Sequence, residues 1–287
     1  MKGFISDFKK LIKLRLTFLV VFSASISFVI AKENWAGIQW KNWIILIVGG
    51  FLVTGAANGF NEIIEKDLDK LMARTADRPL PSGKMTNGQA LVLSLIMGIF
   101  GTYLLGSLNL TTGILSVFSI LFYAFIYTPL KRVGTIAVFM GAIPGALPPL
   151  IGYVAAHGKI DTLALILFAI QFVWQFPHFW AIAWVLDDDY KKAGFRLLPT
   201  AKRDRTSAVI TLLFTLLLLP VSLLPTIYGF GGNIIAGVSI FCSLVFIYQA
   251  TMLTLKMDIK SAKSLMYGSF LYLPIVQLVL LFDLIKN

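Results

Sequence analysis

Three oxygen-bearing side chains recur at every fourth position just after the second long apolar segment of the chain. They are Asn61, Glu65 and Asp69, and on a helix neighbours at this spacing share one face, with Cβ atoms about 5–6 Å apart. Carboxylates gathered in this way repel one another unless a cation lies among them, and Mg²⁺ prefers a few carboxylates together with waters and phosphate oxygens. The spacing therefore predicts a catalytic magnesium site, with Asp67 as a further nearby ligand. The alternative is a solvated, charged helix end.

Basic side chains follow this acidic face at once. Arg74 and Arg78 come next, and the planar guanidinium group suits phosphate because it donates hydrogen bonds in pairs. Further along, Lys131 and Arg132 end another apolar segment in the run Y-T-P-L-K-R. We interpret all four as candidates to bind a diphosphate. For the Lys131–Arg132 pair, an anchor at the membrane surface is an equal alternative.

A second acidic cluster lies in residues 186–199, which read L-D-D-D-Y-K-K-A-G-F-R-L-L-P. Enzymes that ionise prenyl diphosphates need two carboxylate groups that bind Mg²⁺, while the metal and basic side chains neutralise the leaving diphosphate. We expect this cluster to complete such a site, with Asp188 and Asp189 as catalytic metal ligands and Lys192 on the diphosphate. Which of the three adjacent aspartates faces the metal stays open. The alternative is a polar helix end at the membrane interface.

A third group of polar and aromatic side chains lies inside an apolar segment, in residues 171–184 (Q-F-V-W-Q-F-P-H-F-W-A-I-A-W). An imidazole within a membrane span normally faces the bundle interior and marks a functional site, so His178 is a candidate. A hydrogen-bonded structural histidine is the alternative. Trp174 and Trp180 could line a substrate, although packing explains an aromatic stripe equally well.

The composition excludes a soluble domain. The 287 residues are 57% hydrophobic and 14% charged, and apolar stretches of about 18–24 residues, the length that crosses a bilayer, recur throughout. The formal net charge of +11 is expected to set membrane topology and to meet lipid or anionic substrate rather than nucleic acid. We predict an all-α bundle of about nine transmembrane helices in one domain of residues 1–287. The expected spans are 14–31, 42–60, 88–107, 111–129, 134–156, 162–185, 206–225, 233–254 and 264–285.

Loop charges orient this bundle. All but four of the 25 Lys and Arg residues fall on the side of the N-terminus, the exceptions being Lys32, Lys41, Lys159 and Lys286. The positive-inside rule then puts the N-terminus in the cytoplasm. Both acidic clusters lie on the same side, so the chemistry is expected at the cytoplasmic face of the cell (inner) membrane. Residues 1–13 alternate apolar residues with lysine and are expected to lie along the membrane surface.

Taken together, these motifs resemble those of the UbiA-type intramembrane prenyltransferases. The resemblance covers residues 10–285 and rests on the spaced Asn61, Glu65 and Asp69, followed by Arg74-Thr75 and Arg78-Pro79-Leu80. With Y-T-P-L-K-R, P-H-F-W-A-I-A-W and D-Y-K-K-A-G-F-R-L-L-P, the chain is most similar to the members that farnesylate heme. The chain departs from the superfamily in having Glu65 where Asp is usual, in lacking two aspartates four residues apart in the second motif, and in the V-G-T-I-A that follows Lys131-Arg132.

The resemblance implies a fold, a reaction and partners. The expected fold surrounds a central cavity open to the cytoplasmic leaflet. The implied reaction joins farnesyl diphosphate to a vinyl group of heme B with addition of water, giving heme O and diphosphate, with Mg²⁺ bridging the diphosphate. It also implies that His178, Trp174 and Trp180 contact the heme substrate, and that a heme A synthase or an oxidase-assembly protein is a partner.

Two alternatives remain at the level of the sequence. A prenyltransferase of the same superfamily could act on a quinone precursor or a chlorin, and product analysis separates these. An ion-coupled transporter would need carboxylates near the membrane midplane and is favoured by inverted repeats, and we see no internal symmetry in the sequence.

Overall fold

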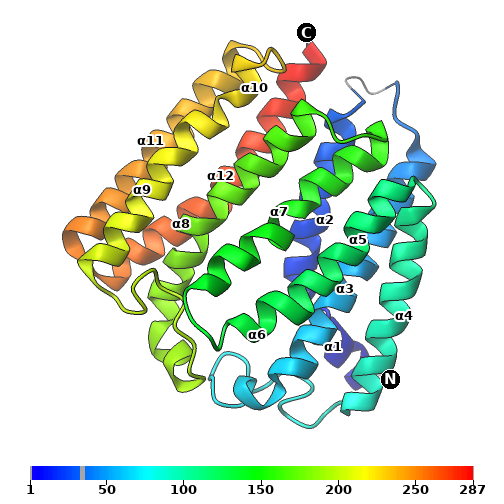
Figure 1. The fold of residues 1–287 in the computed structure, drawn as a ribbon, viewed down its shortest axis with the longest axis vertical. Helices are drawn as coiled ribbons and strands as arrows, with labels where there is room; N and C mark the ends of the chain where they lie inside the picture. The colour runs from blue at the N-terminus through cyan, green and yellow to red at the C-terminus, as the bar shows by residue number, and fades with distance from the viewer. Residues whose placement is uncertain (1, 33–35, 287) are drawn as a thin grey trace.

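The computed structural model describes residues 2–32 and 36–286, and in this part of the chain every regular element is helical (Figure 1). The elements are α1 (Lys2–Leu11), α2 (Leu14–Ile30), α3 (Trp40–Asp69), α4 (Asn87–Gly106), α5 (Leu110–Leu121), the π-helix η1 (Phe122–Tyr127), α6 (Thr128–Leu130), α7 (Ile136–His157), α8 (Thr162–Lys192), α9 (Arg205–Ser222), α10 (Leu224–Ile227), α11 (Asn233–Lys256) and α12 (Ile259–Lys286). The predicted all-α class is confirmed.

Eight helical segments in the described residues are long and apolar enough to cross a membrane. Two of them combine shorter elements: Leu110–Leu130 joins α5, η1 and α6, and Arg205–Ile227 joins α9 and α10. A ninth span results when α1 and α2, which meet at a bend of 51°, count as one. The prediction of about nine transmembrane helices is therefore confirmed for this part of the chain.

Two helices run well past the ends that the apolar segments predict. The apolar segment ends near residue 60, yet α3 continues to Asp69, because residues 62–68 are mostly good helix formers and neither Gly nor Pro interrupts them. In the same way α8 continues past residue 185 to Lys192. Both acidic clusters therefore lie on helical extensions rather than in loops.

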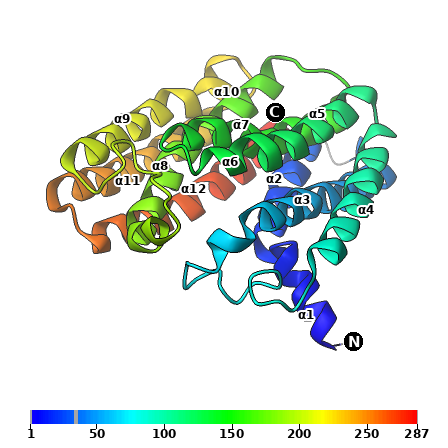
Figure 2. The ribbon, with the colours of Figure 1, turned by 60° about the horizontal axis from the view of Figure 1, so that its bottom comes forward.

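The segments that follow α3, α6 and α8 lie at one end of the bundle (Figures 1 and 2). We call residues 61–86, 128–135 and 186–204 the charged end. The N-terminus lies toward this end and the C-terminus at the opposite one (Figure 1). Side-chain caps define where helices begin, as when Asp204 accepts a hydrogen bond from the Ser207 amide at the start of α9.

The helices α2, α7, α8 and α12 pack against one another and share buried amides. Ser23 donates to Gln171 at 2.9 Å, and Gln277 donates to Ser23 at 2.8 Å. Such pairing is required because a bilayer offers no water to unpaired polar groups. Close approach needs a small residue, since a Cβ on Gly152 would lie 1.9 Å from the Ala24 carbonyl oxygen of α2.

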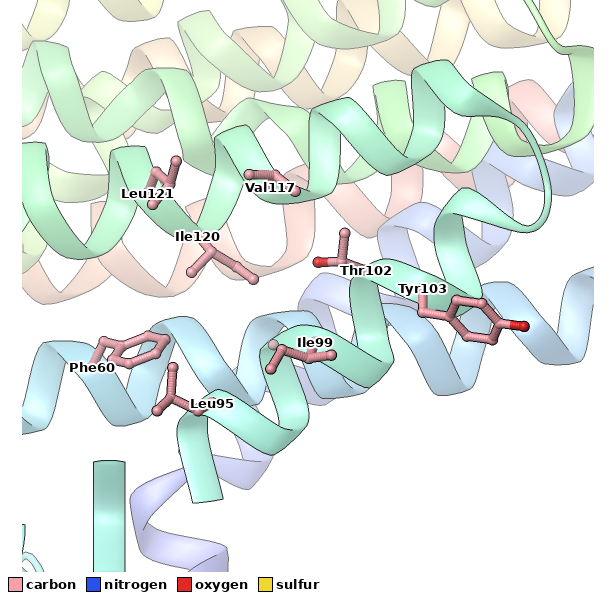
Figure 3. Close-up of a pocket in the computed structure, with 9 residues that line it drawn as sticks. Phe60, Leu95, Ile99, Thr102, Tyr103, Val117, Ile120 and Leu121 are labelled. Carbon is pink, nitrogen blue, oxygen red and sulfur yellow. The ribbon is translucent and has the colours of Figure 1, made fainter. Parts of the chain in front are cut away.

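An apolar groove of about 490 Å³ lies between α3, α4 and α5, and its lining contains no acidic side chain (Figure 3). Its lining includes Phe60, Ile99 and Leu121, and Ile99 is 67% exposed. A smaller void of about 30 Å³ lies among residues of α2, α3, α4, α5 and α7. The central cavity that the resemblance implies stays a prediction.

Candidate active site at the charged end

The last turns of α3 bury the first acidic face. Asn61 and Asp69 are fully buried and Glu65 is 3% exposed, so the helical spacing places all three inside the protein. Glu62 is buried beside them and accepts a hydrogen bond from the Leu80 amide at 3.1 Å. Asp67 differs: its side chain is 88% exposed and pairs with Lys70 at 3.1 Å. The structure therefore does not bring Asp67 together with the other three.

Basic side chains from three different segments meet this face. Arg78 donates to Asp69 Oδ2 at 2.6 Å, and Lys131 Nζ lies 2.8 Å from Glu65 Oε1. Charges paired away from water attract each other more strongly than at a surface, and each partner offsets part of the other's desolvation cost. Although burial opposes the charged form, the Glu65 carboxylate holds the pKa of Lys131 above its ordinary value. The ammonium group is therefore charged at neutral pH.

The third basic group was not among the sequence candidates. Lys13 lies between α1 and α2 with φ of 48°, and its Nζ donates to Asn61 Oδ1 at 2.5 Å. The bend is fastened to α3 by Asn58, which donates to the Ile12 carbonyl at 3.1 Å. Residues 1–13 are therefore not wholly a surface segment, since Phe4 is 52% exposed while Ile12 is buried. The sequence does contain a signal for this contact, namely a lysine that interrupts the apolar residues at the first span.

The π-helix η1 supplies a hydroxyl to the same cluster. Pro129 has no N–H to donate to the carbonyl four residues earlier. The amide of the preceding residue, Thr128, bonds to the Tyr123 carbonyl five residues earlier, which is the wider π pattern. The Thr128 hydroxyl then donates to the Tyr123 carbonyl and accepts from Asn61 Nδ2, both at 2.9 Å. Asn61 also donates to Glu65 at 2.9 Å, so its orientation is fixed from three sides.

The second acidic cluster separates into three environments. Asp187 is buried and pairs with Lys191 at 2.6 Å, whereas Asp188 is 75% exposed and binds Arg203 at 2.9 Å. Asp189 reaches across to the segment after α3 and accepts hydrogen bonds from the backbone amides of Ala73 at 3.0 Å and residue 74 at 3.4 Å. Three adjacent helical residues point about 100° apart, so their carboxylates differ in burial and in most of their partners.

The remaining basic candidates lie near this bridge or at the edge of the charged end. Lys192 pairs with Asp189 at 3.1 Å, and the Arg74 guanidinium lies 6.0 Å from the centre of the Tyr190 ring. Arg132 donates to the Ile64 carbonyl of α3 at 3.3 Å rather than to a carboxylate. Arg203, which sequence reasoning missed, holds the second cluster by contacting two of its aspartates.

The donor set fits Mg²⁺ held jointly with a phosphate ligand. Within the described residues, no group of three or more His, Cys, Asp or Glu side chains is close enough to hold a metal ion by itself. Mg²⁺, however, is usually bound by one or two carboxylates plus substrate phosphates. Asp69 Oδ1 and Glu62 Oε2 are buried without a hydrogen-bond partner in the described part of the chain. Such oxygens have lone pairs left for a cation.

The three heme candidates on α8 have different surroundings. Trp180 is 1% exposed and packs in an aromatic core with Phe176 and Phe214. Trp174 and His178 are only partly buried, and their rings stack with centroids 4.4 Å apart. The structure brings these two together and leaves Trp180 in the core.

Comparison with known proteins places the chain in a family. The model of the UbiA prenyltransferase family matches residues 20–273, which include both acidic clusters. The chain belongs to the UbiA prenyltransferase family. It is 48% identical over 276 residues to a protoheme IX farnesyltransferase of Cytophaga hutchinsonii, with 96% of each chain covered. It is 40% identical to one of Flavobacterium johnsoniae, covering 98% of this chain and 95% of the relative.

Solved structures show the UbiA fold. A digeranylgeranylglyceryl phosphate synthase superposes with a TM-score of 0.84 at 22% identity, with both chains fully covered. A UbiA homolog from Archaeoglobus fulgidus, solved with DMAPP and Mg²⁺, superposes with a TM-score of 0.68 at 12% identity over 98% of this chain and 99% of that one. This UbiA protein is therefore a multi-pass membrane enzyme of the prenyltransferase class, as the sequence predicts.

Proposed function

We propose that this enzyme transfers the farnesyl group of farnesyl diphosphate to a vinyl group of heme B, with addition of water, to give heme O and diphosphate. The heme acceptor is supported by the relatives named protoheme IX farnesyltransferase, which match nearly the full chain. The diphosphate donor is supported by one observation above all, the buried face of Asn61, Glu65 and Asp69 with a basic side chain against each residue.

The proposed reaction balances without an external oxidant or reductant. The bond between C1 of the farnesyl group and the diphosphate oxygen breaks, and its electron pair leaves with the diphosphate. The allylic carbon bonds to the terminal carbon of the vinyl group. A water oxygen then bonds to the carbon next to the porphyrin ring, and one proton is released. The protein has to stabilise negative charge on the leaving group and exclude other water from the cation.

The buried face supplies the charge for the first step. Glu65 and Asp69, with the Asn61 amide oxygen, would hold Mg²⁺, which when bound neutralises charge on the diphosphate. Arg78 and Lys131 already lie against these acids and would share their hydrogen bonds with phosphate oxygens. The farnesyl chain would pack on apolar helix faces, where burial contributes about 0.8 kcal/mol per CH₂.

Other residues would act around this core. Lys13 and Arg74 would add positive charge, and Lys192 would do so from the second cluster. We propose that Asp189 contributes by fixing the segment that holds Arg74, because both of its oxygens are bonded to that segment's backbone amides. Asp188 faces solvent and would reach the metal only through a rearrangement of α8.

We further propose that the charged end faces the cytoplasm and that the N-terminus lies on the cytoplasmic side of the cell membrane. The supporting observation is the concentration of Lys and Arg in the segments at that end. The heme product would leave into the bilayer or to a heme-modifying or oxidase-assembly partner.

A product assay tests the reaction. Membranes containing the enzyme would receive farnesyl diphosphate, Mg²⁺ and either heme B or a hydroxybenzoate quinone precursor, and mass spectrometry would identify the products. We expect a hydroxyethylfarnesyl heme. A prenylated quinone precursor without any heme product would overturn the acceptor and leave the diphosphate site intact.

A further inference from the structure

The side chains of His178 and Ser269 join α8 to α12, which lie side by side in the bundle (Figure 1). The imidazole Nδ1 lies 2.7 Å from Ser269 Oγ. The same hydroxyl donates to the Met266 carbonyl of its own helix at 2.6 Å. Ser269 Oγ is therefore within hydrogen-bond distance of both the imidazole and a backbone carbonyl.

This relay assigns the proton on the histidine. Both contacts are hydrogen bonds at the same time only if the Ser269 hydroxyl gives its one hydrogen to Met266 and its oxygen accepts from His178. In that arrangement Nδ1 bears the hydrogen and donates, and Nε2 keeps its lone pair. Within the described residues, no hydrogen bond to Nε2 is found, although the ring is only partly buried.

The ring is also held in one plane. Trp174 stacks on it at 4.4 Å with 17° between the planes, and its indole N–H donates to the Ser269 carbonyl at 3.0 Å. Phe270 meets the imidazole edge-on at 5.4 Å. An imidazole whose second nitrogen donates a hydrogen bond, and whose orientation is fixed by its neighbours, is the usual form of a histidine that binds a metal.

We propose that Nε2 of His178 is an axial ligand of the iron in the metalloporphyrin substrate. The inference rests on the proposed function and adds how the acceptor is held. A propionate contact would need an N–H on the free nitrogen, which this tautomer lacks. His178 and Asp189 are 11 residues apart, so they share one face of α8 about 16 Å apart along its axis. Along the axis of α8, the iron would therefore lie farther from the charged end than the segment that Asp189 binds.

Absorption spectroscopy of bound heme tests this ligand. Ferric heme B would be titrated into the purified full-length protein in detergent, and the Soret band recorded. We expect a saturable shift to an imidazole-ligated spectrum in wild type, its loss in His178→Ala, and its return when free imidazole is added. His157→Ala is the matched control, because the chain's other histidine lies at the end of α7 beside Asp161. It should behave as wild type.

Two further measurements keep the test decisive if His178→Ala folds poorly. Ser269→Ala should weaken heme binding about 10- to 100-fold, as loss of the group that orients a metal-bound histidine does. Iron-free protoporphyrin IX should bind wild type more weakly than heme B. Equal binding of the two porphyrins, or an unchanged Soret band in His178→Ala, would overturn the ligand assignment even if the enzyme makes farnesylated heme. A missing heme product in the separate turnover assay would instead overturn the proposed function.

Discussion

The side-chain nitrogen of Lys13 lies 2.5 Å from the amide oxygen of Asn61, although the two residues are 48 positions apart in the chain. The contact exists because Lys13 adopts a left-handed backbone conformation at the bend between α1 and α2. The N-terminal segment therefore contributes a basic group to the site on α3. This relationship makes the bend part of the candidate active site.

Replacing Lys13 by Met should lower turnover about 10- to 100-fold, which is about 1.4–2.7 kcal/mol of transition-state stabilisation. The side chain keeps its length and loses only the charge that would face the diphosphate. The control is Lys10→Met, because Lys10 forms a largely exposed pair with Asp77, and exposed pairs contribute little. Equal activity of Lys13→Met and Lys10→Met would remove Lys13 from the site.

Replacing Arg78 by Ala should destabilise the protein by about 3 kcal/mol, since it leaves the Asp69 carboxylate buried without its partner. The Arg78 side chain is 16% exposed and that of Asp69 is 1% exposed. The double variant Arg78→Ala/Asp69→Ala should lose less than the sum of the two single variants. Denaturant unfolding in detergent measures this cycle, and strictly additive losses would mean that the pair is not coupled.

Replacing Asp189 by Ala should raise the KM for farnesyl diphosphate more than it lowers kcat. The side chain bonds to the backbone at residues 73 and 74, so its loss would free the segment that positions Arg74. Limited proteolysis within residues 70–86 should become faster as well. Asp188→Ala should change neither, because that carboxylate is exposed and binds Arg203. A larger effect from Asp188→Ala would favour a direct metal role for that residue.

Metal binding should depend on diphosphate. Because the described side chains do not form a cage of three or more acidic or histidine ligands, substrate phosphates must complete the coordination shell. Electron paramagnetic resonance with Mn²⁺ should show weak binding to the protein alone and much tighter binding when inorganic diphosphate is present. Tight stoichiometric binding without diphosphate would contradict this arrangement.

The fold and one half of the site could be predicted from the sequence. Apolar segments of membrane length predict the spans, and the spacing of Asn61, Glu65 and Asp69 predicts their shared face, because both signals are local. The sequence also grouped Asp67 with these residues, because it lies only two positions from Asp69. On the helix, however, Asp67 points to another side and its side chain is exposed.

What the sequence could not predict depends on contacts between distant segments. Lys13 reaches Asn61 only through the bend that Asn58 fastens. Three adjacent aspartates give no local sign of which is buried, and the structure buries Asp187, exposes Asp188 and joins Asp189 to the segment after α3.

The most direct test of the buried acidic face compares Asp69→Asn with Asp67→Asn in one turnover assay with farnesyl diphosphate, heme B and Mg²⁺. Both substitutions remove one charge with little change in volume, but only Asp69 is buried with an oxygen left free for a cation. We predict that Asp69→Asn loses at least about 100-fold in kcat, which is about 2.7 kcal/mol, while Asp67→Asn stays within about twofold of wild type. Equal activities, or a larger loss in Asp67→Asn, would contradict the account.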